Sequence, residues 1–333
     1  MSHIEQTIDA LVAPGKGILA ADESIPTITK RLAAIGVEST PESRYAYRHL
    51  LLSTPSLSNY IGGIILHEET LTQTGEHGLL TDIMQPIQVG IKVDAGLTHL
   101  ANGYDEQITQ GLDGLSERLQ RYKEAGATFT KWRSVYRIDD HCPSQLAIHA
   151  NAEVLARYAA IVQDNDMVPI VEPEVLFDSN HSIEQSYAAT SAVIDAVFTA
   201  LKRHRVDFEY MILKPNMITP GKQSNEPINP EEVAHYTLNA FMRHVPAAVP
   251  SINFLSGGIP ADMAYECLKE MNQMGEWLPW RLSYSFARAL QEPCMEAWKG
   301  DKSHFDAAQA TFIDYVKKNS ACLADYAENM HTA

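Results

Sequence analysis

Eight short apolar runs, separated by longer segments of helical period, constrain this chain more than any other feature of its sequence. The runs cover residues 17–22, 61–67, 87–94, 129–136, 168–175, 210–216, 251–258 and 280–286. Each run is typical of a buried β-strand, and the segments between them favour amphipathic helices, for example at 150–163, 186–204 and 230–244. Eight β–α repeats in one undivided chain predict a closed (β/α)8 barrel rather than an open doubly wound sheet.

The same pattern predicts a single domain over residues 1–333, because no low-complexity linker or shift in composition interrupts it. The interval between the first two runs is long enough for two helices, expected near 24–35 and 42–53. A leading helix is expected before the first run. The barrel should be followed by a last helix near 303–325, so that residues 303–333 form a C-terminal helix and a short tail.

Composition and charge exclude several classes of protein. The net charge of −16 argues against a general binder of nucleic acid or of anionic membranes. The N-terminal stretch carries Glu5 and Asp9 and lacks the basic and apolar regions of a secretory signal peptide. The longest charge-free run, 245–261, contains three prolines, so no transmembrane helix is expected. The four cysteines form no C-x-x-C pair, which predicts reduced thiols and a cytoplasmic protein.

Polar side chains stand at the downstream ends of the runs, which is where a barrel of this type has its active site. Three pairs are spaced i, i+2, and this spacing places both members on the same face of a strand. Each residue alone could be a helix cap, a turn or a solvated strand end. Together they predict one site at the mouth of the barrel. The pairs are Lys92 with Asp94, Lys131 with Arg133 and Glu172 with Glu174, and the other candidates are Asp22, Lys214, Ser256, Gly257, Gly258, Ser285 and Arg288.

An anion is the expected ligand of this mouth. Ser256-Gly257-Gly258 could be only a tight turn, but backbone N–H groups after the seventh strand of a barrel commonly bind phosphate. Arg288 could add a charge-assisted donor. Five cations gathered in a protein of charge −16 predict a pocket for a ligand with more than one phosphate. These cations are Lys92, Lys131, Arg133, Lys214 and Arg288.

Lys214 ends a buried run directly before Pro215, where a charged amine is costly unless it is paired, solvated or neutral. Taken alone, a solvated strand end is the simpler interpretation. A neutral lysine attacks carbonyl carbons, and both desolvation and a neighbouring cation such as Lys131 favour the neutral form. Glu172, expected on the strand between them, is placed to move protons. With Asp22 as an assisting carboxylate, the set predicts a Schiff-base enzyme for sugar phosphates.

The sequence resembles a known family, the class I fructose-1,6-bisphosphate aldolases, from about residue 5 to about residue 325. The motifs are GKGILAADES (15–24), KRL (30–32), GIKVD (90–94), KWR (131–133), IVEPE (170–174), LKPNM (213–217), FLSGG (254–258) and ARALQ (287–291). The resemblance implies a (β/α)8 barrel that assembles as a homotetramer and works in glycolysis and gluconeogenesis. It also implies a metal-independent lyase with no cofactor and with a sugar bisphosphate as its substrate.

The resemblance further implies a role for each candidate. Lys214 would form the Schiff base with the ketone carbon of fructose 1,6-bisphosphate, and Glu172 would be the principal acid and base. Asp22 would help to deprotonate the C4 hydroxyl, and Lys131 would support charge and orientation. One phosphate would be held by Ser256, Gly257, Gly258, Ser285 and Arg288. Ser24, Lys92 and Arg133 would lie toward the other phosphate, and Arg31 would be a further substrate contact. Asp94 and Glu174 would support these site residues.

The sequence departs from the family pattern at three places, and three alternatives to fructose 1,6-bisphosphate cleavage stay open. Ile25-Pro26-Thr27 replaces the usual Thr-Gly-Ser, Ala287 replaces a glycine, and Ala95 stands where a lysine often follows. The sequence does not separate this substrate from sedoheptulose 1,7-bisphosphate or tagatose 1,6-bisphosphate, and a non-catalytic phosphate-binding barrel is the remaining alternative. A metal-dependent aldolase is disfavoured because no two of the thirteen histidines lie nearer than eight residues apart.

Overall fold

A closed parallel barrel of eight strands is the centre of the structure, a computed structural model that describes residues 2–274 and 278–329. The strands are adjacent in the order β1-β12-β11-β10-β9-β8-β5-β2. The predicted (β/α)8 barrel is therefore confirmed. The strand bounds are β1 Gly17–Ala21, β2 Ile61–Leu66, β5 Gln88–Lys92, β8 Phe129–Tyr136, β9 Val168–Val175, β10 Ile212–Leu213, β11 Ser251–Phe254 and β12 Arg281–Phe286.

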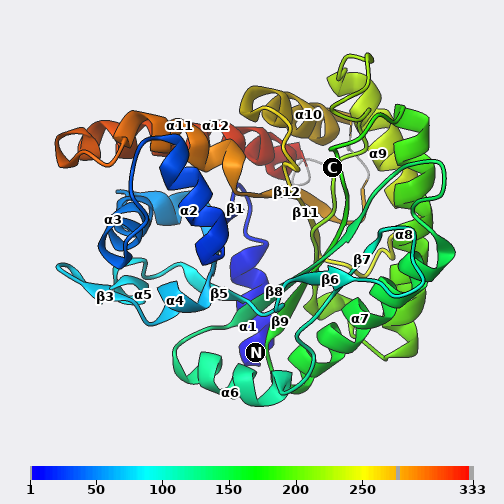
Figure 1. Ribbon diagram of the computed structural model, residues 1–333, viewed down its shortest axis with the longest axis horizontal. Helices are drawn as coiled ribbons and strands as arrows, with labels where there is room; N and C mark the ends of the chain where they lie inside the picture. Colours follow the sequence, from blue (N-terminus) through cyan, green and yellow to red (C-terminus); the bar gives the residue numbers. More distant parts are fainter. Residues whose placement is uncertain (1, 275–277, 330–333) are drawn as a thin grey trace.

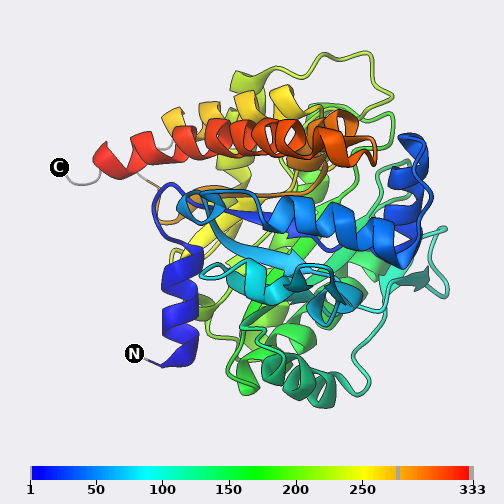
Figure 2. The ribbon, with the colours of Figure 1, turned by 90° about the vertical axis from the view of Figure 1, so that its left-hand side faces the viewer.

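Helices surround the strands on the outside of the barrel (Figure 1). The last helix, α12, packs against α10 and α11 along one side of it (Figure 2). The longer helices are α1 His3–Leu11, α2 Ile25–Ala34, α3 Pro41–Leu52, α6 Leu115–Glu124, α7 Gln145–Asp164, α8 Ile183–Arg203, α9 Pro230–His244, α10 Ala261–Met274, α11 Arg288–Trp298 and α12 Phe305–Asn329. Shorter elements are α4 Glu68–Leu71, α5 Leu80–Ile83 and the 3-10 turns η1 Leu57–Asn59, η2 Phe208–Tyr210 and η3 Lys302–His304.

Local sequence explains where several helices begin. Ser182 and Gln185 form a capping box at α8, in which each side chain bonds the backbone N–H of the other. Asn229 caps α9, and Pro230 follows it at the first helical position, where its missing N–H costs nothing. These caps define where α8 and α9 begin, several residues after the ends of the preceding strands. The residues between strand end and helix are therefore available to form the mouth of the barrel.

Helix α1 closes the end of the barrel opposite the mouth. Its Ile8 and Leu11 are buried in a cluster with interior residues of the strands, including Ile65 and Phe129. Gly63 allows this approach, because a Cβ there would lie 2.4 Å from Leu11 and 2.9 Å from Phe129. The barrel interior is therefore a packed core at this end and is open to solvent only at the other end.

Three details differ from the predicted runs. The run 210–216 contains only the two-residue strand β10, because residues 208–210 form the turn η2. The last helix begins at Phe305, after η3, and extends beyond the predicted 325 to Asn329; residues 330–333 of the predicted tail lie outside the described part. Two hairpins were not predicted, since strands of two or three residues show no period: β3 Thr74–Gly75 with β4 Gly78–Leu79, and β6 Leu97–His99 with β7 Gln107–Thr109. Within 2–274 and 278–329, no helix combines the length and the apolar character needed to cross a bilayer.

Candidate active site

The register of the parallel strands brings the predicted residues into one cavity at the mouth. Leu213 pairs with Val171, so Lys214 and Glu172, one position further along, stand beside each other. The cavity has a volume of about 700 Å³. All fifteen residues predicted for the site line it except Gly258.

Four side chains at the bottom of the cavity form a continuous chain of alternating charge. The Lys214 amine lies 3.2 Å from Oε1 of Glu172, and the Lys131 amine lies 3.2 Å from Oε2 of the same carboxylate. On its other side, Lys131 Nζ is 2.6 Å from Oδ2 of Asp22. Lys214 is only 3% exposed. The simple interpretation of Lys214 as a solvated strand end is therefore wrong.

The charges of Lys131 and Asp22 hold each other in the ionised state. Burial alone would raise the pKa of Asp22, but the ammonium groups of Lys131 and Lys214 outweigh it and lower this pKa to about 2. Burial likewise works against the charged form of Lys131, yet Asp22 and Glu172 raise its pKa above the ordinary value. At neutral pH the pair is an ammonium and a carboxylate. Asp22 is then a weak base, and its negative charge is its main contribution.

One side of the cavity offers unused donors for an anion. The Ser285 hydroxyl is buried and finds no hydrogen-bond partner within the described residues. Gly258 has a φ of 102°, and a Cβ there would lie 2.8 Å from Nη2 of Arg288. Glycine at this position thus leaves room for the Arg288 guanidinium, which lines the cavity while Gly258 lies behind it. Ala287, which replaces the usual glycine, has a φ of −108°, so its side chain causes no backbone strain.

A second set of donors lies at the start of α2. Ser24 is the N-cap residue of this helix, but its side chain accepts no hydrogen bond from the first turn. Its hydroxyl is instead 3.0 Å from that of Thr27, which also lines the cavity. Lys92 reaches the same cavity with its amine 2.6 Å from Asp94. The N-terminus of a helix with free N–H groups and a nearby ammonium favours an anion.

Carboxylates accompany most of the cations, so the cavity is less positive than the cations alone predicted. Arg133 pairs with Glu174, and this carboxylate outweighs burial in raising the pKa of the arginine. Arg31 is held 2.5 Å from Glu23 and 2.9 Å from the amide oxygen of Gln291. Of the five cations predicted at the mouth, only Arg288 lacks an ion pair in the described ranges. Arg288 is therefore the cation most available to a ligand.

The cavity also contains residues that the sequence did not indicate. They include Glu23, His67, Glu68, Arg118 and Tyr122. Arg118 and Tyr122 come from α6 and carried no strand-end signal. His67 did carry one, since it directly follows β2.

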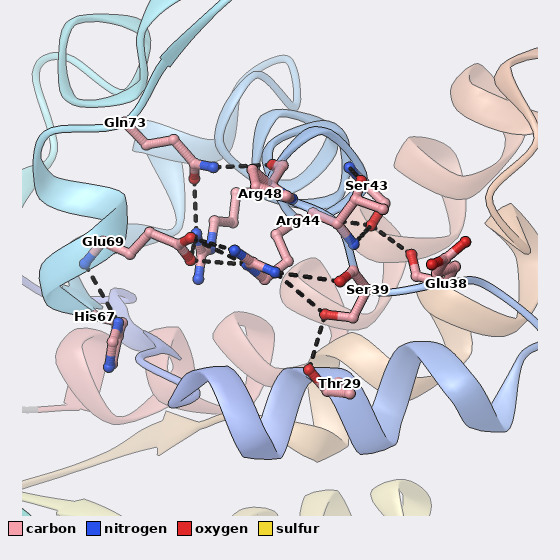
Figure 3. Close-up of polar contacts among 11 residues, drawn as sticks. Thr29, Glu38, Ser39, Ser43, Arg44, Arg48, His67, Glu69 and Gln73 are labelled. Atoms are coloured by element: carbon pink, nitrogen blue, oxygen red, sulfur yellow. Dashed lines mark hydrogen bonds and ion pairs between the residues drawn. The ribbon is translucent and has the colours of Figure 1, made fainter.

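Next to His67, an ionic cluster with two buried arginines joins α3 to α4 (Figure 3). We call Arg44, Arg48 and Glu69 the Glu69 cluster. The Glu69 carboxylate receives Arg44 Nη2 at 2.6 Å and Arg48 Nη1 at 2.6 Å. Burial would raise the pKa of Glu69, but its hydrogen bonds and ion pairs with the two arginines lower it to about 2. The cluster fixes α4, and with it the end of β2.

An acid-unfolding experiment checks this cluster. A carboxylate whose pKa is lowered in the folded state stabilises the fold above its unfolded pKa, near 4, and loses that contribution as pH falls toward 2. We expect the free energy of unfolding to fall between about pH 4 and pH 2, and to fall less steeply in Glu69→Gln. Urea unfolding followed by circular dichroism at a series of pH values measures both slopes. Equal slopes would show that Glu69 is not held ionised by the arginines.

No group of three or more histidine, cysteine, aspartate or glutamate side chains in residues 2–274 and 278–329 is arranged to hold a metal ion. The chemistry open to the cavity is instead that of a buried amine beside a carboxylate. Donors for phosphate lie around both.

Comparison with known proteins gives consistent similarities over most of the chain. The family model described as fructose-bisphosphate aldolase class-I matches residues 3–333. The protein named fructose-bisphosphate aldolase 4, cytosolic, of Arabidopsis thaliana is 49% identical over 317 residues, which are 94% of this chain and 81% of that protein. The fructose-bisphosphate aldolase of Dictyostelium discoideum is 47% identical over 320 residues, 94% of this chain and 89% of that protein.

A solved structure agrees with these sequences. It is the fructose-bisphosphate aldolase of Plasmodium falciparum in complex with TRAP and a small-molecule inhibitor. The two folds superpose with a TM-score of 0.95 and 42% sequence identity, over 97% of this chain and 94% of that one. Sequence and fold are therefore similar to the same group of proteins.

Proposed function

Because the chain belongs to the class I fructose-bisphosphate aldolase family, we propose that it cleaves fructose 1,6-bisphosphate through a Schiff base on Lys214. The family is one of metal-independent lyases, and its reaction is the reversible cleavage of this sugar to dihydroxyacetone phosphate and glyceraldehyde 3-phosphate. The observation that supports the role of Lys214 is its buried amine, 3.2 Å from Glu172 at the bottom of a cavity rimmed by anion donors. Release of both triose phosphates from fructose 1,6-bisphosphate, measured with a chelator present, tests the proposal.

The mechanism begins when the Lys214 ammonium gives a proton to the Glu172 carboxylate 3.2 Å away, which leaves a neutral amine. This amine attacks the C2 carbonyl of the substrate, and the resulting carbinolamine loses water to give an iminium ion. Glu172, a carboxylate again after it has protonated the departing water, takes the C4 hydroxyl proton. The C3–C4 bond then breaks, and its electron pair moves into the iminium to form an enamine. Glyceraldehyde 3-phosphate leaves, the enamine is protonated at C3, and hydrolysis releases dihydroxyacetone phosphate and restores Lys214.

Glu172 is the proton carrier of this scheme. Its carboxylate lies between Lys214 and Lys131, within reach of the amine where water is lost and regained. Lys131 supplies a fixed positive charge, and Asp22, with a pKa of about 2, accepts a hydrogen bond from the C4 hydroxyl rather than holding a proton itself. Arg133 and Lys92 are kept in place by their ion-pair partners Glu174 and Asp94.

We expect Glu172→Gln to lower kcat by about 10²- to 10⁴-fold, the usual contribution of a positioned acid and base. Glutamine keeps the shape of the side chain, so the melting temperature should change far less than it does when a buried group is deleted. Steady-state cleavage kinetics from pH 5 to pH 9 measures the loss. A variant with wild-type kcat and an unchanged pH profile would remove Glu172 from the mechanism.

The two donor sets are proposed to bind the two phosphates. Ser285, Arg288 and the N–H groups near Gly257 receive the phosphate of the ketone half, since they lie at or just beyond the ends of β11 and β12. These are the next two strands around the barrel from β10, which leads to Lys214. Ser24 and Lys92 receive the other phosphate, with Arg31 as a further contact. Pro26 removes one N–H donor from the start of α2, and Ala95 supplies no second ammonium group beside Lys92.

Location, pathway and assembly are inferred from the relatives. Three relatives carry the words "cytosolic" or "cytoplasmic" in their names, which supports a cytoplasmic location for this chain and a role in glycolysis and gluconeogenesis. Residues 1–333 are proposed to form one domain and to assemble as a homotetramer, as the family resemblance implies. Light scattering at several protein concentrations tests the assembly.

A further inference from the structure

His67 lies at the end of β2 among the residues that line the cavity, and the mechanism proposed above does not use it. Leu66 pairs with Ala21 of β1 on one side and with Ile91 of β5 on the other. The next residues along these three strands are Asp22, His67 and Lys92, and all of them line the cavity. His67 therefore lies between the strand that leads to the Ser24 site and the strand that carries Lys92.

The hydrogen bonding of His67 fixes which nitrogen carries the proton. The backbone N–H of Glu69 donates to Nδ1 of His67 at 3.3 Å, so Nδ1 is an acceptor and the neutral ring carries its hydrogen on Nε2. Burial lowers the pKa of His67, and the charges of Arg48 and Lys92 lower it further. The ring is thus neutral at pH 7. Its Nε2–H has no hydrogen-bond partner in the part of the chain that the structure describes.

The Glu69 cluster holds this ring in one orientation. Figure 3 shows the Glu69 carboxylate between Arg44 and Arg48, while its backbone nitrogen reaches the ring of His67, which extends away from the arginines. Arg44 also bonds Ser39, and Ser39 accepts a hydrogen bond from Thr29 of α2. The first turn of α4 is therefore tied to α3 and α2. A donor on such a support is pre-organised, so it loses little entropy when it binds a ligand.

We propose that Nε2–H of His67 donates a hydrogen bond to an oxygen of the aldehyde half of the sugar bisphosphate. This proposal rests on the proposed function. Strand β10, which leads to Lys214, lies four positions from β2 in the ring of eight, so the two strand ends face each other across the mouth. With the ketone carbon bonded to Lys214, the carbons beyond C3 extend toward β1, β2 and β5. The nearest ligand oxygens for His67 are then hydroxyls of this half or its phosphate.

The competing explanation is that His67 only caps α4, and two substitutions separate the explanations. Asparagine is a good N-cap residue, so His67→Asn keeps an acceptor for the Glu69 N–H but cannot place a donor where Nε2 lies. His67→Ala loses both the cap and the donor. His99→Asn is the matched control, because His99 is exposed on β6 and away from the residues that line the cavity.

For His67→Asn we expect a melting temperature close to wild type and a rise of about tenfold in KM for fructose 1,6-bisphosphate, with a smaller change in kcat. Borohydride trapping with dihydroxyacetone phosphate should be unchanged, since this ligand lacks the aldehyde half. Fructose 1-phosphate identifies the acceptor oxygen. If the loss disappears with this substrate, the acceptor is the second phosphate; if the loss persists, the acceptor is a hydroxyl.

Two results overturn the inference. One is wild-type KM and kcat in His67→Asn together with lowered stability in His67→Ala, which makes His67 a cap alone. The other is an equal loss of trapping and cleavage in His67→Asn, which indicates a general disturbance of the site. If the proposed function itself is wrong, wild-type protein will form no adduct with dihydroxyacetone phosphate. This result distinguishes failure of the proposed function from the two results above.

Discussion

Lys214→Ala is expected to lower kcat for fructose 1,6-bisphosphate cleavage by on the order of 10⁵-fold or more, because it removes the nucleophile on which every later step depends. No other lysine in residues 2–274 and 278–329 has its amine beside Glu172 except Lys131. Lys131, the nearest candidate, is held as an ammonium between Asp22 and Glu172, and an ammonium has no free electron pair with which to attack. The loss should appear in kcat, while the phosphate donors continue to bind substrate.

Covalent trapping measures this prediction directly. The protein is incubated with dihydroxyacetone phosphate and a chelator, reduced with borohydride, digested and analysed by mass spectrometry. Wild type should carry one substrate-sized adduct on Lys214, and Lys214→Ala should carry none. Lys302→Ala is the matched control, because this side chain is 93% exposed and should neither carry nor affect the adduct. An adduct spread over surface lysines in wild type would contradict a Schiff base at Lys214.

The sequence was sufficient for the barrel because the alternation of strand and helix is a long-range pattern that short local errors do not disturb. It also identified the site, since parallel strands bring their carboxyl ends to one edge. Lys214 and Glu172 could be placed side by side for this reason alone, and the register of Leu213 with Val171 agrees. The i, i+2 pairs were informative because a strand turns both members the same way, as Lys131 and Arg133 show by lining one cavity.

Other features depend on contacts between distant residues that no local pattern reports. The Glu69 cluster joins residues 21 and 25 positions apart through ion pairs, and no local pattern in the sequence indicates that Arg44 and Arg48 are buried. The net charge of the mouth could not be read from the sequence, because the pairing of Arg133 with Glu174 joins two different strands and depends on how they lie side by side. His67 could not be identified from the sequence, since a lone histidine at a strand end does not differ from a helix cap until the fold places it among the residues that line the cavity.

The second large effect is expected for Lys131→Met, which keeps the length of the side chain and removes its charge. Lys131 is 4% exposed and neutralises two carboxylates, Asp22 at 2.6 Å and Glu172 at 3.2 Å. Removing the cation leaves buried carboxylates without their partner, which costs about 3–5 kcal/mol in the free energy of unfolding. The substitution also removes the charge that contributes most to keeping the pKa of Asp22 near 2. Burial should therefore raise the pKa of Asp22 in the variant.

Activity and stability should separate in a double variant. Lys131→Met alone is expected to lose about 10²- to 10⁴-fold in kcat, because the acid–base pair loses its fixed charge. Adding Asp22→Asn removes one of the stranded carboxylates, so part of the stability should return while activity stays low. Urea unfolding and cleavage kinetics on the two single variants and the double variant give the coupling free energy. If Asp22→Asn restores no stability to Lys131→Met, the 2.6 Å contact is not an ion pair that the fold depends on, and Lys131 acts on the reaction through Glu172 alone.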